Sequence, residues 1–253
     1  MESVEAVETF AFEPLPLAIQ RFRPPDGEML AVVTISLPAS AGAGVPAIIA
    51  RFEPKAGGGR ARILGEDSFR VDGEGEGRVA QGRVALSSGA WSVTVLAVDA
   101  ASGASRIYRG TVDPLPDPSA GPTLSDLVFA RELEPLPFAA QASYTDPYIV
   151  GGFRVTPRGA RALPRGEPLQ VFFEIYGGTM PGHLTYVLEG QEDDGRWRKL
   201  ASPPERAATE RGQAFVLPTG PSWPLGGYRL RVRFEDASGT PAEGTIAWTL
   251  LAP

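Results

Sequence analysis

The chain contains no cysteine among its 253 residues. That absence excludes disulfide bonds, thiolate metal ligands and cysteine nucleophiles together. Histidine occurs once, at His183, so the usual zinc sites lack their ligands, and a Ser-His-Asp catalyst would depend on that single residue. No Gly-x-Ser-x-Gly motif accompanies it. We therefore expect no enzyme, no catalytic residues, no metal and no cofactor, and we interpret His183 as a loop or strand-edge residue.

Lysine is also scarce, because only Lys55 and Lys199 occur and arginine supplies the remaining positive charge. The net charge is −6 at pH 7, and a chain of this sign repels phosphate backbones at long range, so we expect no nucleic-acid partner. No apolar run approaches the roughly 20 residues that span a bilayer, so we expect no transmembrane segment. Residues 1–12 carry three glutamates where a signal peptide would have a basic start, and no signal peptide is expected.

Glycine (30 residues) and proline (25 residues) are abundant and lie between short apolar runs, which is typical of many strands joined by turns. Alternating apolar residues predict strands most clearly at 29–37 and 91–98. The pattern therefore predicts an all-β protein. The other expected strands cover residues 47–52, 77–86, 105–112, 149–156, 169–176, 184–189, 197–200, 213–217, 228–234 and 245–251.

Two segments repeat each other in the same order along the chain. The segment from Gly89 to Asp99 resembles the segment from Gly226 to Asp236, and at nearly the same offset 30–35 resembles 169–175. In each copy we expect glycine to make a turn, an aromatic residue to anchor between two sheets, and aspartate to start the next turn. The repeat predicts two tandem immunoglobulin-like β-sandwich domains that arose by internal duplication.

Proline marks the expected boundary between the two domains. The stretch 113–119 has three prolines in seven residues and is unsuited to a central strand. We expect a first β-sandwich at 1–116, a proline-rich linker and connecting segment at 117–147, and a second β-sandwich at 148–253. Within the linker, 124–133 has the apolar residues of either a strand or a short helix. The prolines are expected to restrict motion between the domains.

The same strand motifs carry a resemblance to a known group. LSDLVFA at 124–130, YIVGGFRVTPRG at 148–159, LQVFFEIYG at 169–177 and LGGYRLRVRFED at 225–236 resemble the β-rich C-terminal region of bacterial GWxTD-domain proteins and related envelope proteins that accompany von Willebrand A modules. The likeness is best from 86 to 240, and the Gly-Trp-x-Thr-Asp signature itself is absent. The resemblance implies a β-sandwich protein of the bacterial cell envelope or periplasm, and it supplies no catalytic residues.

One expected strand carries a stripe of arginines. Arg229, Arg231 and Arg233 project from the same face because side chains alternate along a strand. The stripe is a candidate docking site for an acidic protein partner. The alternative is that cross-strand carboxylates neutralise it on a solvated face.

The four tryptophans divide into two groups by their neighbours. Trp91 and Trp248 alternate with small or polar residues and are interpreted as core. Trp197 and Trp223 are interpreted as candidate surface aromatics for binding a partner or stacking on a sugar.

Two acidic runs resemble parts of ion sites. The glycine-acid run at 72–77 places oxygens like the opening of a calcium loop, but Arg83 stands where the bidentate glutamate belongs, which favours a solvated hairpin loop. The run at 192–195 ends in Asp-Gly and predicts a β-hairpin turn. A weak calcium or partner site is the alternative for the second run.

Two functional hypotheses follow. The first is a noncatalytic protein-interaction or structural scaffold module, for example an accessory subunit of a larger membrane-associated assembly of respiratory or photosynthetic kind. The second is a carbohydrate-binding module of the cell envelope. An exposed apolar patch across both domains favours the first hypothesis, and a shallow groove with coplanar aromatics favours the second.

Overall fold

The computed structural model describes residues 13–24, 27–37, 46–56, 59–73, 78–99, 103–137, 146–159 and 161–253. In these ranges the regular secondary structure consists of strands and two single-turn 3₁₀ helices, which are η1 (Glu66–Ser68) and η3 (Pro118–Ala120). No helix in the described ranges is long and apolar enough to cross a bilayer. The expected all-β class is confirmed.

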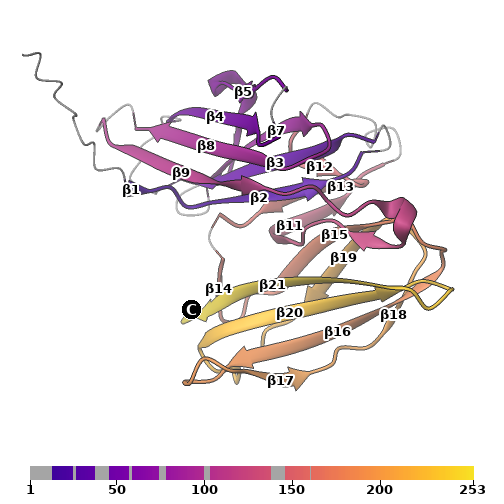
Figure 1. Ribbon diagram of the computed structural model, residues 1–253. Coiled ribbons are helices and arrows are strands. Elements are labelled where there is room, and N and C mark those ends of the chain that lie inside the picture. The colour runs from indigo at the N-terminus through magenta and orange to yellow at the C-terminus, as the bar shows by residue number, and fades with distance from the viewer. Residues whose placement is uncertain are drawn as a thin grey trace, which may run out of the picture.

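The first sandwich consists of two sheets that enclose one apolar core (Figure 1). Sheet A has the order β1 (Glu13–Pro14), β9 (Ser105–Val112), β8 (Trp91–Val98), β4 (Ala47–Pro54) and β5 (Arg62–Leu64). Sheet B has the order β2 (Leu17–Phe22), β3 (Met29–Ser36), β7 (Val79–Leu86) and β6 (Arg70–Asp72). On β8, buried residues alternate with partly exposed ones, as the sequence pattern predicts for a strand with one face on a core.

The second sandwich repeats this architecture around a second core. Sheet C has the order β10 (Thr123–Leu124), β15 (Leu169–Tyr176), β11 (Val128–Pro135), β13 (Phe153–Pro157) and β12 (Ile149–Val150), and β19 (Gly212–Leu217) also pairs with β15. Sheet D has the order β14 (Ala162–Pro164), β21 (Pro241–Leu251), β20 (Gly226–Glu235), β16 (Gly182–Gln191) and β17 (Trp197–Ala201), and β18 (Arg206–Ala208) also pairs with β16.

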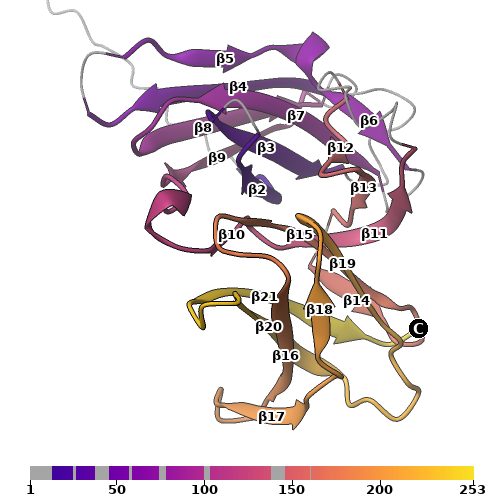
Figure 2. The ribbon, with the colours of Figure 1, turned by 90° about the vertical axis from the view of Figure 1, so that its right-hand side faces the viewer.

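A third apolar cluster lies between the sandwiches, where strands of sheet B face strands of sheet C (Figure 2). Strands β3 and β15 are therefore buried on both faces. This explains why their sequences are nearly continuous apolar runs, because a strand with one solvated face would alternate with polar residues. We call this cluster the third core; its buried members are Phe22, Val32, Val128, Ala130, Val155 and Phe172.

The segment 117–147 differs from the expected linker. It contains η3, β10 and β11, and both strands pair with β15 of the second sandwich. Since Leu124 and Phe129 belong to the second core and Val128 to the third, this part is strand rather than helix or connection. Residues 138–145 of the expected linker lie outside the described ranges.

The two sandwiches share features beyond strand order. β1 pairs in parallel with β9, and β14 pairs in parallel with β21. The Trp91 indole N–H donates to the carbonyl of Ser87 at 3.1 Å, and the Tyr228 hydroxyl donates to the carbonyl of Pro224 at 2.7 Å. Both bonds reach back four residues at the start of equivalent strands, like the tyrosine corner of immunoglobulin-like sandwiches. The order of the first strands along the chain differs between the sandwiches. The parallel edge strand β1 precedes β2, whereas its equivalent β14 follows β11. The duplication therefore stays a prediction.

Candidate interaction site

The third core joins the sandwiches through aromatic side chains from both. The Phe172 ring centroid lies 6.3 Å from that of Phe22 in the first sandwich and 5.4 Å from that of Phe153. Phe172 is fully buried, although its side chain lies on the face of β15 opposite to Phe173, which is in the second core. Burial of this kind contributes stability in proportion to the apolar area removed from water.

A bidentate ion pair closes one side of this contact. Arg21 of β2 donates from Nε to Asp126 Oδ2 at 2.8 Å and from Nη2 to Oδ1 at 2.7 Å. The Arg21 backbone N–H also donates to Oδ2 at 2.8 Å, and the Asp126 N–H donates back to the Arg21 carbonyl at 3.2 Å. Two parallel charge-assisted bonds fix orientation as well as distance. We call this pair the Arg21–Asp126 clamp.

A buried carboxylate lies beside the clamp. Glu174 is 3% exposed, and its Oε2 accepts from the Tyr176 hydroxyl at 2.5 Å and lies 3.3 Å from Arg211. Desolvation raises the pKa of Glu174, and the nearby Arg211 charge opposes that rise. The Tyr176 oxygen accepts the backbone N–H of Arg23 at 2.8 Å, so the chain of bonds crosses between sandwiches. Tyr176 itself packs in the first core.

The far side of the contact is also hydrogen-bonded. The Tyr148 hydroxyl lies 2.9 Å from the carbonyl of Arg70 and 3.2 Å from that of Val79, both in the first sandwich. Arg83 donates across the contact to the carbonyl of Ile149 at 2.9 Å. Hydrogen bonds therefore join the two sandwiches on both sides of the third core and restrict their relative orientation.

A cleft of about 410 Å³ opens beside the Arg21–Asp126 clamp. Its walls come from β2 and β9 of the first sandwich and from β21, Leu127 and Arg161 of the second. Figure 1 shows β9 and β2 running along one side of the first sandwich, with β21 on the same side of the second. Sequence patterns did not indicate this cleft, because its walls meet only after the sandwiches pack together.

The predicted arginine stripe has carboxylate partners. The side chains of Arg229 and Arg231 both contact Glu189 of β16, the second at 3.1 Å. Arg233 lies 3.1 Å from Glu235 and 3.4 Å from Glu243. The hydrogen bond from Arg229 is the largest cause of the lowered pKa of Glu189. Glu189 and Glu243 are the cross-strand carboxylates of the alternative considered from the sequence, and docking of an acidic partner on the stripe stays a prediction.

The two tryptophans proposed as surface aromatics do not form one platform. Trp223 is half-buried, packs on the second core and stacks on Tyr228 with ring centroids 5.4 Å apart. Trp197 lies on the outer face of sheet D, where the Arg229 guanidinium covers its ring at 4.6 Å. They lie on opposite faces of sheet D, because Tyr228 points into the core and Arg229 points out. Trp91 and Trp248 are buried, which confirms them as core.

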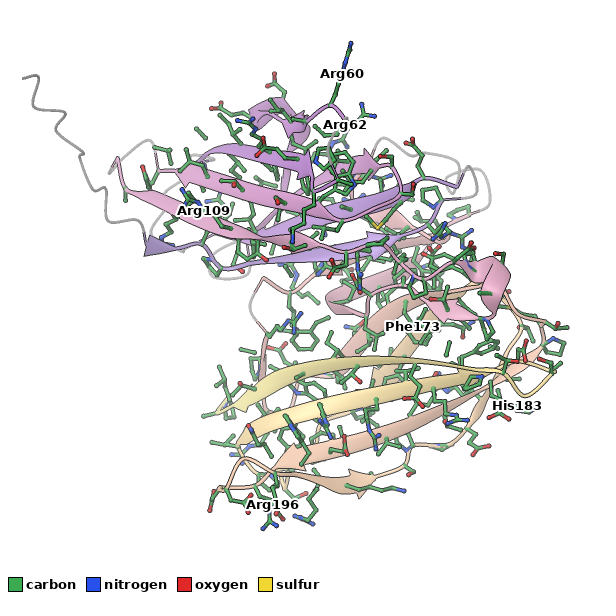
Figure 3. All side chains as sticks on the ribbon, viewed as in Figure 1. Arg60, Arg62, Arg109, Phe173, His183 and Arg196 are labelled. Carbon is green, nitrogen blue, oxygen red and sulfur yellow. The ribbon has the colours of Figure 1, made fainter. Side chains whose placement is uncertain are left out.

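The remaining sequence candidates lie apart from one another. The run 192–195 forms the predicted hairpin turn between β16 and β17, with the Gly195 N–H donating to the Glu192 carbonyl at 2.8 Å. The glycine-acid run is only partly described, since 74–77 lie outside the described ranges. His183 is an exposed residue of β16 at the end of the sandwich opposite Arg196 (Figure 3). The described ranges contain no group of three or more His, Asp or Glu side chains placed to hold a metal ion.

The outer face of sheet A carries an apolar row that sequence reasoning missed. Ile49, Leu96 and Ile107 are cross-strand neighbours on β4, β8 and β9, and Ile63 of edge strand β5 lies diagonal to Ile49. Ile49 is 48% exposed and Ile63 is 65% exposed. The signal was available, because Ile49 occupies an outward position in the alternation of β4.

Charged side chains flank the apolar row of sheet A. Arg51 and Arg109 lie on either side of Thr94 in the adjacent cross-strand row. Arg51 pairs with Glu53 at 2.7 Å, and Arg109 is exposed on the outer side of β9 (Figure 3). Sheet D has the same strand order as sheet A, and its row equivalent to the apolar row contains Arg233 and Glu243. The two outer faces therefore differ in chemistry.

Comparison with known proteins leaves the family open. No protein-family model matches the chain, and no curated protein matches it. Solved structures with a similar part include a DUF4785 family protein from Legionella pneumophila (12% identity, 84% of this chain and 50% of that chain, TM-score 0.24). Others are red sea bream transglutaminase (13%, 96% and 32%, TM-score 0.25) and a tetra-tandem repeat from the extending region of a large adhesion protein (11%, 95% and 50%, TM-score 0.26). The chain spans half or less of each of these three structures, and likenesses this distant carry no argument about function.

Proposed function

We propose that this chain is a noncatalytic protein-interaction or structural scaffold module. The observation that carries the proposal is the third core with its flanking polar bonds, which joins two sandwiches into one body. A scaffold must hold separate surfaces at a fixed orientation, and loosely linked domains do not. The resemblance to bacterial envelope proteins adds the expectation that the assembly is associated with a membrane.

The outer face of sheet A is the surface proposed to contact the partner. Its apolar row, with Ile49 and Ile63 exposed, has the composition of an interface centre, and Arg51 and Arg109 supply a charged rim. The partner we propose is a protein surface with apolar residues flanked by carboxylates. The outer face of sheet D is less suited, because its equivalent row holds the ion pair of Arg233 and Glu243 where sheet A has exposed isoleucine.

Affinity purification of the tagged chain from its native cells, with and without detergent-solubilised membranes, tests this proposal. We expect a stoichiometric protein partner for the wild type and its loss in the double variant Ile49→Lys/Ile63→Lys. The matched control is Val216→Lys/Leu225→Lys, which places the same charges at exposed apolar residues of the second sandwich. The control is expected to keep the partner.

Two results would count against the proposal. A chain that purifies alone under both conditions would remove the scaffold function and justify a glycan array screen for the carbohydrate alternative. A partner retained by Ile49→Lys/Ile63→Lys would remove sheet A as the contact surface.

A further inference from the structure

Strand β2 presents a free backbone edge to the cleft. In the described ranges β2 pairs only with β3. The N–H and C=O of Arg21 point away from β3, because both bond to Asp126. In an antiparallel ladder this orientation alternates, so Ile19, two residues earlier, directs its own N–H and C=O to the same side. That side is the cleft, which Ile19 lines.

Strand β9 presents a second free edge to the same cleft. The Ile107 carbonyl accepts the N–H of Leu15 at 3.2 Å where the short β1 pairs with β9. By the same alternation Thr111 directs its backbone groups to that side. Beyond Ile107, the ladders of the described strands pair β9 only with β8. Thr111 also lines the cleft, so two strand edges border one space of about 410 Å³.

We propose that this cleft binds an extended segment of a protein partner, which adds as a strand to the free edge of β2. Strand addition takes its affinity from main-chain hydrogen bonds and its specificity from pockets for alternate side chains. This inference deepens the proposed interaction function but uses a surface separate from the outer face of sheet A.

The cleft walls define the side chains that such a segment would carry. On the first sandwich, Leu17, Ile19 and Tyr108 pack partly against the first core and would contact an apolar side chain. On the second, Arg161 is exposed and forms no ion pair with the described residues, so it favours a carboxylate. The Arg21–Asp126 clamp closes one end. The ligand is therefore an extended peptide that contains an apolar and an acidic residue.

Selection of a phage-displayed library of random nine-residue linear peptides against the full chain tests the inference. We expect the enriched peptides to share an apolar and an acidic residue, and the bound peptide to slow amide hydrogen exchange at Ile19. Ile19→Pro is expected to weaken binding by about tenfold, because proline lacks the N–H that the added strand needs. Proline is tolerated where the N–H faces away from the ladder.

Ile19→Val is the matched control, since it keeps the N–H and most of the apolar side chain, and it should bind like the wild type. Arg161→Ala should weaken the binding of peptides that contain an acidic residue and leave the binding of peptides without one unchanged. Three results would each overturn the inference. The selection enriches no peptide, or the enriched peptides bind a folded Ile19→Pro variant as tightly as the wild type. The third result is that bound peptide leaves amide exchange at Ile19 of the wild type unchanged. None of these results affects partner capture through sheet A, which Ile49→Lys/Ile63→Lys tests separately.

Discussion

Aromatic residues at the starts of β8 and β20 each bond to the carbonyl four residues earlier. The sequence repeat predicted that Trp91 and Tyr228 anchor between sheets, and both are buried in the two cores. The hydrogen bonds themselves were not predictable, because they depend on how the preceding turn folds back. The aspartate after each strand was predicted to start a turn, and Asp236 does so by accepting the N–H groups of Ser238 and Thr240.

Tyr228→Phe tests the corner bond. We expect it to lower the free energy of unfolding by about 1–2 kcal/mol, because the Pro224 carbonyl loses its donor. Urea denaturation measures the loss. Tyr186→Phe is the control, since the Tyr186 ring is buried while its hydroxyl forms no hydrogen bond with the described residues, and a loss of the same size there would contradict the role of the bond.

Glu189 gives the arginine stripe a dependence on pH. The hydrogen bond from Arg229 holds the pKa of Glu189 below its ordinary value, so the pair stabilises the fold above the ordinary pKa and is lost as pH falls through the lowered one. Glu189→Gln should cost about 1–3 kcal/mol at pH 7. The difference from wild type should shrink as the pH falls below the ordinary carboxyl pKa.

Denaturation series at several pH values measure this difference. Glu53→Gln is the control, because Glu53 and its partner Arg51 are both more than half exposed and such pairs contribute about 0–1 kcal/mol. A Glu189→Gln penalty that stays constant down to strongly acidic pH would contradict the account.

At the scale of elements, alternation predicted the long strands well. β9 and β15 have the expected bounds, and β8, β16 and β20 lie at or near theirs. The short strands β5, β6, β14 and β18 were missed because three residues carry too little pattern. β2 was missed for a different reason: its sequence LAIQRF mixes core, third-core and clamp residues, so no two-residue period is visible.

Phe172 and Phe173 offer a matched test of the two faces of β15. Phe172→Ala should cost about 3–5 kcal/mol and open the third core, so that amides of β2 and β3 exchange faster. Phe173→Ala removes the same group from the second core and should leave exchange in β2 and β3 unchanged. Exchange mass spectrometry measures both, and equal acceleration in the two variants would contradict the separate third core.

At the scale of the whole molecule, the sequence predicted two sandwiches but not how they meet. Five of the six buried residues of the third core lie in strands that also contribute to the first or second core, whereas Val155 lies in β13, which contributes to neither. The apolar runs of these strands gave no prediction of a third core. The runs did carry a signal, since both faces of 29–37 and 169–176 lack regular polar positions. Neither run predicts which surface covers the second face of its strand, because that depends on tertiary packing.

The central claim is that the sandwiches form one rigid body, and the absence of native cysteine makes a direct test practical. Spin labels on Arg62→Cys and Lys199→Cys, both exposed and on different sandwiches, allow pulsed electron resonance to measure the distance distribution between them. The account predicts one narrow distance peak, and a broader distribution after Phe172→Ala is added. A broad or multiple distribution in the chain with intact Phe172 would contradict the account.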